Sequence, residues 1–478
     1  MSASALLASA THPSELYALF HYIITAPKAP SPAKTIKSLT PSSPSYTYAK
    51  CYDFLNLTSR SFARVIQELD AELRHPVCIF YLVLRGLDTV EDDMTLGIER
   101  KKEVLEKFHE LIYVPGWNFQ ESGEGEKDRA LLVEFEVVIA EFLKLKESYQ
   151  LIIADITKRM GHGMSSYVSK PTSSKTQITN PAHLIEIQTT AEYNLYTHYV
   201  AGLVGIGLTN LFVASGLENP TLASPERAEL ANEMGQFLQK VNILKDFLED
   251  LNEGRIFWPK DVWEKYVPAD DKEVEALAKA ENLDRALACL NALVLDALKL
   301  VPSCLEYMAG LRNPTVFQFC AIPQMMAIAS LNEFFNNPAI FQRVGTKIRR
   351  GLAVKLMLAS TDMDSIKRTY HDFALSINQR NAKRVGTNKE DESFFGIAVA
   401  CADIVRWTHI HDKSHPSSDL NSKRIDSGYA LADTAKSALS GPKSSTFYNS
   451  VLPTSWVVLL VVAAVVAGWA IYAGANGV

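Results

Sequence analysis

The feature that most constrains this chain is its succession of helix-length segments between about Tyr48 and Trp407. Apolar residues recur at i, i+3 and i+4 within residues 99–114, 130–160 and 225–251, which is the spacing of an amphipathic helix. Convincing runs of alternating apolar and polar residues, which would indicate strands, are absent from the sequence. We therefore expect one all-α domain in which two packed helical halves surround a central cavity.

Changes in composition divide the chain into four regions. Residues 1–47 combine a short helix, Ser14 to Ile24 with Ser14 as its N-cap, and an arm rich in proline and serine. Residues 48–410 form the predicted helical domain, with loops at residues 115–128, 171–181 and 216–225. Residues 411–454 are polar and are predicted to be a flexible linker to a membrane-spanning segment, residues 455–474.

The predicted membrane segment contains no charge from Trp456 to Ala473. A helix of about 18 residues just crosses a bilayer core of roughly 30 Å. Trp456 and Trp469 lie near its two ends, and Lys436 and Lys443 before it favour a cytosolic position for the rest of the chain. A buried core helix is the alternative, but few residues follow that could cover it. A GPI signal would need a secretory signal, and the first residues do not resemble one.

Charge and cysteine content exclude two kinds of function. The net charge of −6 gives no basic face for nucleic acid. The six cysteines are scattered, form no CxxC pair and mostly lie in apolar surroundings. We expect buried, reduced thiols rather than disulfides or a zinc site.

Two acidic stretches are the candidates for chemistry. Asp88, Glu91 and Asp92 stand at i, i+3 and i+4, on one face of a helix, whereas Asp93 points away from them. Three carboxylates on one face repel one another unless a cation lies among them. About 150 residues later, a second stretch has the same spacing.

The second stretch contains Asp246, Glu249 and Asp250, and it follows an apolar helical stripe. Facing carboxylates suit Mg²⁺, which binds oxygen ligands and is commonly shared with substrate phosphates. The reaction that this arrangement favours is departure of a diphosphate, whose charge Mg²⁺ neutralises. Basic residues should lie at the same place, and Arg60, Arg85, Lys245 and Arg255 are the candidates. The alternative for either stretch alone is a solvated helix surface.

Several motifs resemble those of squalene synthases in the squalene/phytoene synthase family. They are "YLVLRGLDTVEDDMT", "VNILKDFLEDLNEGRIFWPKDVW", "SRSF", "MGHGM", "YTHYVAGLVGIGL" and "FCAIPQMMAIASL". The resemblance runs from about Ser59 to Arg350, and a C-terminal anchor also fits it. It implies an all-α isoprenoid synthase fold. It also implies condensation of two farnesyl diphosphates to presqualene diphosphate, followed by NADPH-dependent reduction to squalene for sterol biosynthesis.

The resemblance also implies roles for individual residues. Tyr196 would take the proton in the first half-reaction, beside the reacting diphosphate at Asp88, Asp246 and Arg85. The remaining positions follow by type: Mg²⁺ at Asp88, Glu91, Asp92, Asp246, Glu249 and Asp250; diphosphate at Ser59, Arg60 and Arg85; pocket aromatics Phe62, Tyr81 and Phe319; NADPH at Asn242, Arg255, Lys347 and Arg349. A core aromatic remains the alternative for Tyr196, and an exposed helix end remains the alternative for Lys347 and Arg349. The sequence has no Rossmann fingerprint.

The same resemblance implies a location on the endoplasmic reticulum membrane, with a C-terminal tail anchor and a monomeric catalytic domain facing the cytosol. Three positions depart from the family pattern: Lys245 where arginine is typical, Phe247 where tyrosine is common, and Ser165 where alanine is usual. Replacing arginine by lysine keeps the charge but removes the planar fork. We therefore expect an altered affinity for diphosphate mimics, as in a second gene copy tolerant of an inhibitor. Equal inhibitor sensitivity of Lys245→Arg and the parent enzyme would contradict this.

Two competing functions stay open at this point. A phytoene or dehydrosqualene synthase would share the acidic stretches but would form its product without NADPH. A non-catalytic, tail-anchored helical adaptor would keep its function after Asp88→Asn. An enzyme using the acids should instead lose on the order of 100-fold or more in rate.

Overall fold

The computed structural model describes residues 11–25, 43, 45–59, 62–168, 185–384 and 391–410. These residues belong to one compact unit that extends to Pro416. The α-helices are α2 (Pro13–Thr25), α4 (Tyr46–Thr58), α5 (Phe62–Gln67), α6 (Ala71–Asp92), α7 (Ile98–Leu111), α8 (Arg129–Val133), α9 (Glu136–Phe142), α10 (Glu147–Val168), α11 (Thr190–Thr197), α12 (Leu203–Ala214), α13 (Pro225–Lys245), α14 (Phe247–Asn252), α15 (Lys260–Trp263), α16 (Leu283–Leu298), α17 (Val301–Ala309), α18 (Pro314–Phe334), α19 (Ala339–Gln342), α20 (Arg350–Ala359), α21 (Met363–Ala382) and α22 (Phe394–Ile410).

The other elements are short. A π-helical turn, η2 (His198–Gly202), joins α11 to α12, and 3₁₀ turns cover Pro220–Ala223 (η3), Val274–Ala278 (η4) and Ala280–Asn282 (η5). Among the described residues, the strands are only β1 (Ile185–Glu186) and β2 (Arg255–Ile256), which pair in parallel with Ile185 opposite Arg255. The predicted all-α class is therefore confirmed for the part of the chain that the structure describes.

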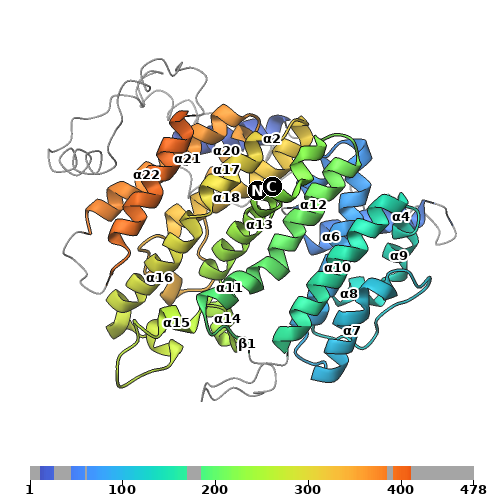
Figure 1. The fold of residues 1–478 in the computed structure, drawn as a ribbon, viewed down its shortest axis with the longest axis horizontal. Coiled ribbons are helices and arrows are strands. Elements are labelled where there is room, and N and C mark those ends of the chain that lie inside the picture. Colours follow the sequence, from blue (N-terminus) through green and yellow to red (C-terminus); the bar gives the residue numbers. More distant parts are fainter. Residues whose placement is uncertain are drawn as a thin grey trace, which may run out of the picture. The chain divides into compact units, whose positions relative to one another are not determined.

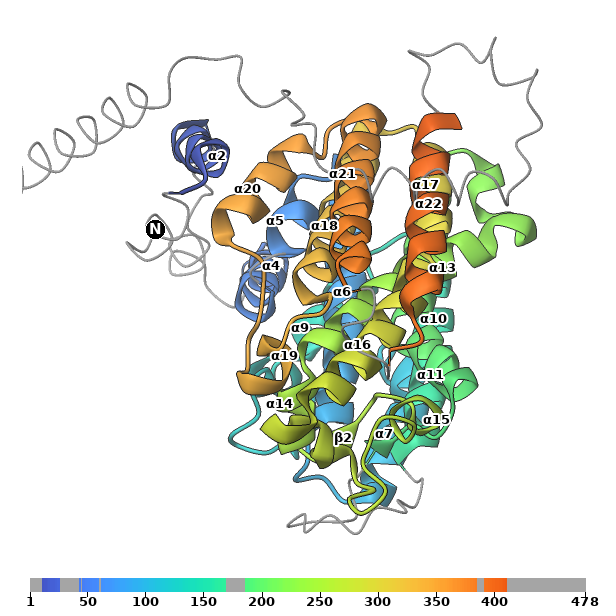
Figure 2. The same ribbon diagram turned by 90° about the vertical axis from the view of Figure 1, so that its left-hand side faces the viewer.

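The long helices lie side by side. In Figure 1, α10, α12, α13, α16 and α22 run with a similar slant, and α6 lies among them. Helix α13 contacts η2, α12, α16, α17 and α18, so it is the central helix of the bundle. The turned view in Figure 2 shows α4, α5 and α20 on one side and α14, β2 and α7 towards one end.

Local signals in the sequence explain where the helices around the centre begin. The Asp70 carboxylate accepts a hydrogen bond from the backbone N–H of Glu72 at 3.0 Å and so caps α6. Asn313 caps α18 in the same way, and Pro314 occupies the first helical position, where a missing N–H costs nothing. Helix α2 begins at Pro13, so Ser14 lies inside the first turn. The prediction that Ser14 is the N-cap was therefore wrong.

Glycines allow α13 to touch its neighbours directly. A Cβ on Gly235 would lie 2.1 Å from the backbone oxygen of Ala201, and one on Gly205 would lie 2.1 Å from that of Ala231. The two helical runs therefore pack backbone against backbone. Gly205 of the "VAGLVGIGL" motif therefore serves helix packing.

Two expected helices are interrupted. Residues 130–160 form the end of α8, then α9 and most of α10, because short turns at residues 134–135 and 143–146 break the run. Residues 225–251 break at Asp246, between α13 and α14, although the N–H of Asp250 still donates to the carbonyl of Asp246 at 2.8 Å. Apolar spacing does not reveal such breaks, since both sides keep the same buried face.

Three described helical runs are apolar and long enough to cross a membrane by length and composition alone: Thr190–Ala214, Ala280–Ala309 and Pro314–Phe334. All three contribute buried side chains to the interior of the unit. The predicted anchor, the polar linker and Arg60 lie outside the described residues. All six cysteines are buried and free, as expected.

Candidate active site

The first acidic stretch lies at the C-terminal end of α6. The Arg85 guanidinium contacts Asp88 at 2.5 Å and Asp128, from the following loop, at 2.7 Å. Burial raises the pKa of Asp88, and the neighbouring Arg85 partly opposes that shift. A cation from the same helix therefore offsets part of the carboxylate repulsion that the sequence predicts.

Glu91 and Asp92 complete this stretch. Glu91 is buried, and its Oε1 atom has no hydrogen-bond partner among the described residues. Burial, followed by the charges of Asp92 and Asp88, raises the pKa of Glu91. The Asp92 side chain is exposed to solvent. Even so, the protein that surrounds its carboxylate and the charge of Asp88 raise the pKa of Asp92 to about 7. Asp93 binds Thr95 and Gly123 instead, so it points away as expected.

The second acidic stretch begins at the break between α13 and α14. Lys245 lies 3.2 Å from the Asp246 carboxylate, and Arg255 lies 3.0 Å from that of Asp250. Burial raises the pKa of Asp250 to about 7 and also raises that of Asp246. The Glu249 side chain is exposed.

Arg255 connects the two acidic stretches. Strand β2 carries this residue, and its pairing with β1 fixes the backbone of Arg255 opposite Ile185. Arg255 forms its ion pairs with Asp250 and Glu253. Its positive charge also reaches Asp88, Glu91 and Asp92, where it opposes part of the rise in pKa that burial causes. We call the space around it the acidic recess, of about 410 Å³ including the part open to solvent; it is lined by Glu91, Asp92, Met94, Lys101, Val168, Ile185, Tyr196, Arg255 and Phe257.

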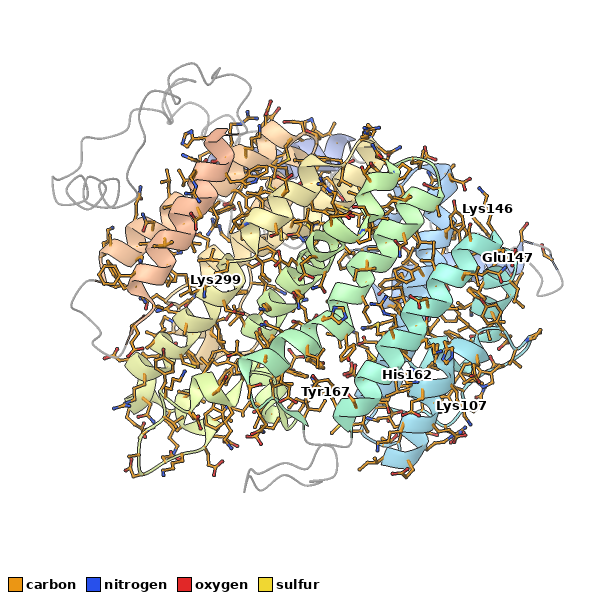
Figure 3. All side chains as sticks on the ribbon, in the orientation of Figure 1. Lys107, Lys146, Glu147, His162, Tyr167 and Lys299 are labelled. Atoms are coloured by element: carbon orange, nitrogen blue, oxygen red, sulfur yellow. The ribbon has the colours of Figure 1, made fainter. Side chains whose placement is uncertain are left out.

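Tyr196 reaches this recess from α11. Its ring stacks on Phe257 with centroids 5.0 Å apart and meets the edge of Tyr167 at 5.1 Å. Figure 3 places Tyr167 at the lower end of α10, next to the start of α11. Burial raises the pKa of Tyr196 well above the usual value, with further contributions from Glu91, Asp92, Asp88 and Asp250. Tyr196 is thus near carboxylates of both stretches.

Two apolar chambers lie along α13. The first, of about 820 Å³ including the part open to solvent, is bordered by α12, α13 and α18, and its lining includes Phe62 and Phe319. The second, of about 1420 Å³ including its open part, lies between α5, α13, α18 and α20 and also has Phe62 in its lining. Asn242, Leu238 and Pro323 line both chambers. The structure therefore brings together three of the predicted substrate and cofactor residues: Phe62, Phe319 and Asn242.

The remaining predicted residues lie in varied places. Ser59 ends α4, and its hydroxyl accepts a hydrogen bond from the N–H of Phe62 at 3.0 Å. Tyr81 is half-buried one turn before Arg85. Lys347 is exposed, and Arg349 forms an ion pair with Glu15 of α2 at 2.7 Å. Arg350, which sequence reasoning did not select, is the basic residue of this group that lines the second chamber.

The carboxylates fit Mg²⁺ as a shared ligand set rather than as a closed cage. Within the described ranges, no group of three or more His, Cys, Asp or Glu side chains lies close enough to hold a metal alone. The acids instead pair with Arg85, Lys245 and Arg255. Mg²⁺ commonly takes one or two carboxylates and completes its shell with water and phosphate. The partnerless, buried Oε1 of Glu91 is an oxygen donor of the required kind.

Of the three departures from the family pattern, Lys245 is the one whose described contacts include an acid of the two acidic stretches. Lys245 pairs with Asp246, as described. The Ser165 hydroxyl donates to Glu106 of α7 at 2.7 Å, away from the recess. Phe247 packs on Trp258 with centroids 4.4 Å apart and on Phe341 at 5.3 Å, where a hydroxyl group is not needed.

Sequence reasoning missed Asp128, Lys101 and Phe257. Asp128 holds Arg85, Lys101 donates to the backbone oxygen of Glu91 at 2.6 Å, and Phe257 stacks on Tyr196. Phe257 directly follows the β2 residues inside a quoted motif, so its position was a usable signal. Asp128 and Lys101 belong to ordinary polar segments, and only the fold brings them to α6.

Comparison with known proteins gives a consistent result. The squalene/phytoene synthase family model matches residues 55–351. Squalene synthase from Bos taurus is 46% identical over 77% of this chain and 82% of its own length. A probable squalene synthase from Neurospora crassa is 48% identical over 77% of this chain and 72% of its own length. The solved structure of TcSQS with the ligand E5700 is 41% identical, with a TM-score of 0.69, over 77% of this chain and 99% of that one. This chain belongs to the squalene/phytoene synthase family.

Proposed function

We propose that this protein is a squalene synthase. In this reaction two farnesyl diphosphates condense to presqualene diphosphate, and NADPH then reduces that intermediate to squalene, the first committed step of sterol biosynthesis. The observation that carries the proposal is the acidic recess, where Glu91, Asp92 and Tyr196 lie around Arg255, which also pairs with Asp250 of the second acidic stretch. The two apolar chambers along α13 suit fifteen-carbon chains, which when bound would shield a cationic intermediate from water.

The two acidic stretches, their basic neighbours and Tyr196 divide the work of the first half-reaction. Asp88, Glu91, Asp92, Asp246, Glu249 and Asp250 would hold Mg²⁺, which when bound supplies positive charge against a departing diphosphate. Arg60 and Arg85, with Ser59, would bind diphosphate oxygens, because guanidinium groups match them bidentately. Arg255, which the resemblance assigns to NADPH, pairs with Asp250 and lines the recess, so it would bind diphosphate oxygens as well. Tyr196 would take the proton that the condensation releases. Its pKa is raised by burial and by the acids, so it needs cationic neighbours to act.

The second half-reaction needs hydride delivery into the same interior. Asn242 lines both chambers and is the proposed contact for the nicotinamide, with Lys347 and Arg349 as contacts for the phosphates. Phe62, Tyr81 and Phe319 would stabilise carbocations through their ring faces. The tail would anchor a monomeric catalytic domain to the endoplasmic reticulum membrane, into which an insoluble product can leave.

Product analysis tests the proposal. Labelled farnesyl diphosphate and Mg²⁺ should give squalene with NADPH and presqualene diphosphate without it. Conversion to a C30 or C40 polyene without NADPH would contradict the assignment and indicate a dehydrosqualene or phytoene synthase. Asp88→Asn should lower the rate on the order of 100-fold or more. Asp155→Asn, an exposed acid of α10, is the matched control and should leave the rate unchanged. An Asp88→Asn protein with full function would instead favour an adaptor.

A further inference from the structure

The helix that carries Tyr196 changes its winding immediately after that residue. Helix α11, the π-helical turn η2 and α12 form one run from Thr190 to Ala214. Within η2, the N–H of Leu203 donates to the carbonyl of His198, one residue further than in an α-helix. Such wide turns are rare and often occur at functional sites. Tyr196 lies only two residues before η2, so the direction of its side chain depends on how this turn is held.

A side chain of α13 fills the wide turn. The Oδ1 atom of Asn232 lies 2.8 Å from His198 Nδ1. A Cβ on Gly202 would lie only 1.9 Å from the same oxygen. The Asn232 amide nitrogen donates in turn to Glu229 at 2.9 Å. Asn232 is buried, hydrogen-bonds the first residue of η2 and lies against the last, so its side chain occupies the space beside the turn.

Two further polar residues continue the same face of α13, at four-residue spacing. Gln236 donates to the backbone oxygen of Asn194 at 2.8 Å. Lys240 is 2% exposed and donates to Asn194 Oδ1 and to Asp296 of α16, both at 2.6 Å. We call Asn232, Gln236 and Lys240 the polar stripe of α13. It binds α11 and η2 on both sides of Tyr196.

A polar stripe inside a helical bundle needs an explanation. Burying a charged amine costs several kcal/mol even when it is paired, and apolar residues of similar volume often stabilise a core better. Ordinary packing would therefore favour leucine or methionine at these three positions. Directional hydrogen bonds instead specify one register between two helices, which apolar contacts do not.

We propose that the polar stripe of α13 positions Tyr196, by fixing the register of α11 and η2 so that the phenol points into the acidic recess. The proposal rests on the proposed function for its catalytic consequence. The stripe residues do not line the recess, so they act through α11. Phe257 stacks on the ring and Tyr167 packs against it edge-on, and the stripe holds the backbone that carries it.

Lys240→Met tests the proposal, because methionine keeps the length of the side chain and removes its donors. We expect kcat for presqualene diphosphate formation to fall at least about tenfold. The KM for farnesyl diphosphate should stay within about twofold, because the substrate contacts remain. Lys240→Arg should restore most of the rate. Gln236→Leu, which removes one hydrogen bond and no charge, is the second variant in case Lys240→Met does not fold.

The matched control is Asn381→Leu. Asn381 is fully buried and donates to the carbonyl of Phe394 at 2.9 Å, between α21 and α22. It should lower the melting temperature without changing kcat. If the stripe variants also lose only thermal stability, the positioning role is wrong.

Hydrogen exchange over residues 190–203 separates this proposal from the proposed function. If the parent protein makes no presqualene diphosphate, the proposed function is wrong. Hydrogen exchange then still shows whether the polar stripe holds α11 and η2. Faster exchange of these amides in Gln236→Leu than in Asn381→Leu would support the positioning role. Equal exchange in the two variants would overturn it.

Discussion

At the scale of single residues, Arg255 links the two acidic stretches through its charge. Its guanidinium pairs with Asp250 and Glu253, and its charge also acts on the acids of α6. Carboxylates this close would otherwise repel one another strongly. The acidic recess thus depends on a cation that strand β2 delivers.

Substitutions of Arg255 should distinguish the effect of its positive charge from that of its planar guanidinium group. Arg255→Lys keeps the charge and loses the fork, so we expect the KM for farnesyl diphosphate to rise about tenfold. Arg255→Leu should be worse, because it leaves Asp250 without its partner. Steady-state kinetics measure both effects. Arg100→Lys is the control, since Arg100 binds Glu121 through a similar fork on the exposed surface. An unchanged KM in Arg255→Lys would remove diphosphate binding from the roles of Arg255.

Glu141 gives the fold a dependence on acid. This buried carboxylate accepts hydrogen bonds from His75, Lys144 and Thr47, and despite opposing burial these partners lower its pKa from 4.5 to about 2. Because the folded pKa is depressed, the stabilisation is present above the unfolded value and is lost as pH falls from about 4.5 towards 2. We expect Glu141→Gln to lose up to roughly 3 kcal/mol at pH 7. Its unfolding free energy should vary less than the parent's between pH 5 and pH 3, as urea titrations at each pH would show. An equal variation would contradict the assignment.

Much of the residue chemistry could be predicted from spacing alone. The i, i+3, i+4 acids identified both stretches, and nearby basic residues identified Arg85, Lys245 and Arg255 as their partners. The ion pair of Arg349 with Glu15 could not be predicted, because 334 positions separate the two residues. Pairings over such distances follow from the packing of α2 against α20, which no local pattern specifies.

At the scale of elements, α13 approaches α12 and η2 more closely than side chains would normally permit. Gly235 and Gly205 provide this approach, each against a backbone oxygen of the other run. A glycine in the sequence does not by itself reveal whether a ligand or another helix approaches it. The break at Asp246 was equally hidden, since α13 and α14 keep one buried face across it.

Gly235→Ala should therefore be strongly destabilising. The new methyl group would meet a carbonyl at 2.1 Å, and the helices would have to separate. We expect a loss of at least about 2 kcal/mol, by analogy with overpacked cores. Denaturant titration followed by circular dichroism measures it. Gly125→Ala is the control, because nothing lies within 4 Å of a Cβ there. Equal stability of the two variants would show that α13 and η2 can move apart freely.

At the scale of the whole molecule, the compact unit ends after α22. Ile397, Cys401 and Ile404 of this helix are buried, and Trp407 packs against the core. A chain cut at Trp407 would lose the last turn of α22, whereas a chain ending at Pro416 keeps it whole.

We therefore expect the chain to tolerate truncation after α22 but not before it. The chain ending at Pro416 should fold and, in detergent, keep a rate within about twofold of the full chain, because the acidic recess and both chambers lie before that point. A chain ending at residue 390 lacks α22 and exposes the side chains that it covers, each worth roughly 1.5–3 kcal/mol. Solubility, circular dichroism and product formation compare the two. Inactivity of the longer chain would show that later residues belong to the catalytic unit.

The six buried cysteines have a practical consequence. Each lies in a different helix: α4, α6, α16, α17, α18 and α22. Burial raises their thiol pKa values, to about 12 for Cys401, and alkylation requires an ionised sulfur that the reagent can reach. A charged maleimide should leave the native chain unmodified, and each sulfur should react only when its own segment opens. Timed labelling with peptide mass spectrometry would then give the order in which six parts of the bundle come apart, without any engineered probe.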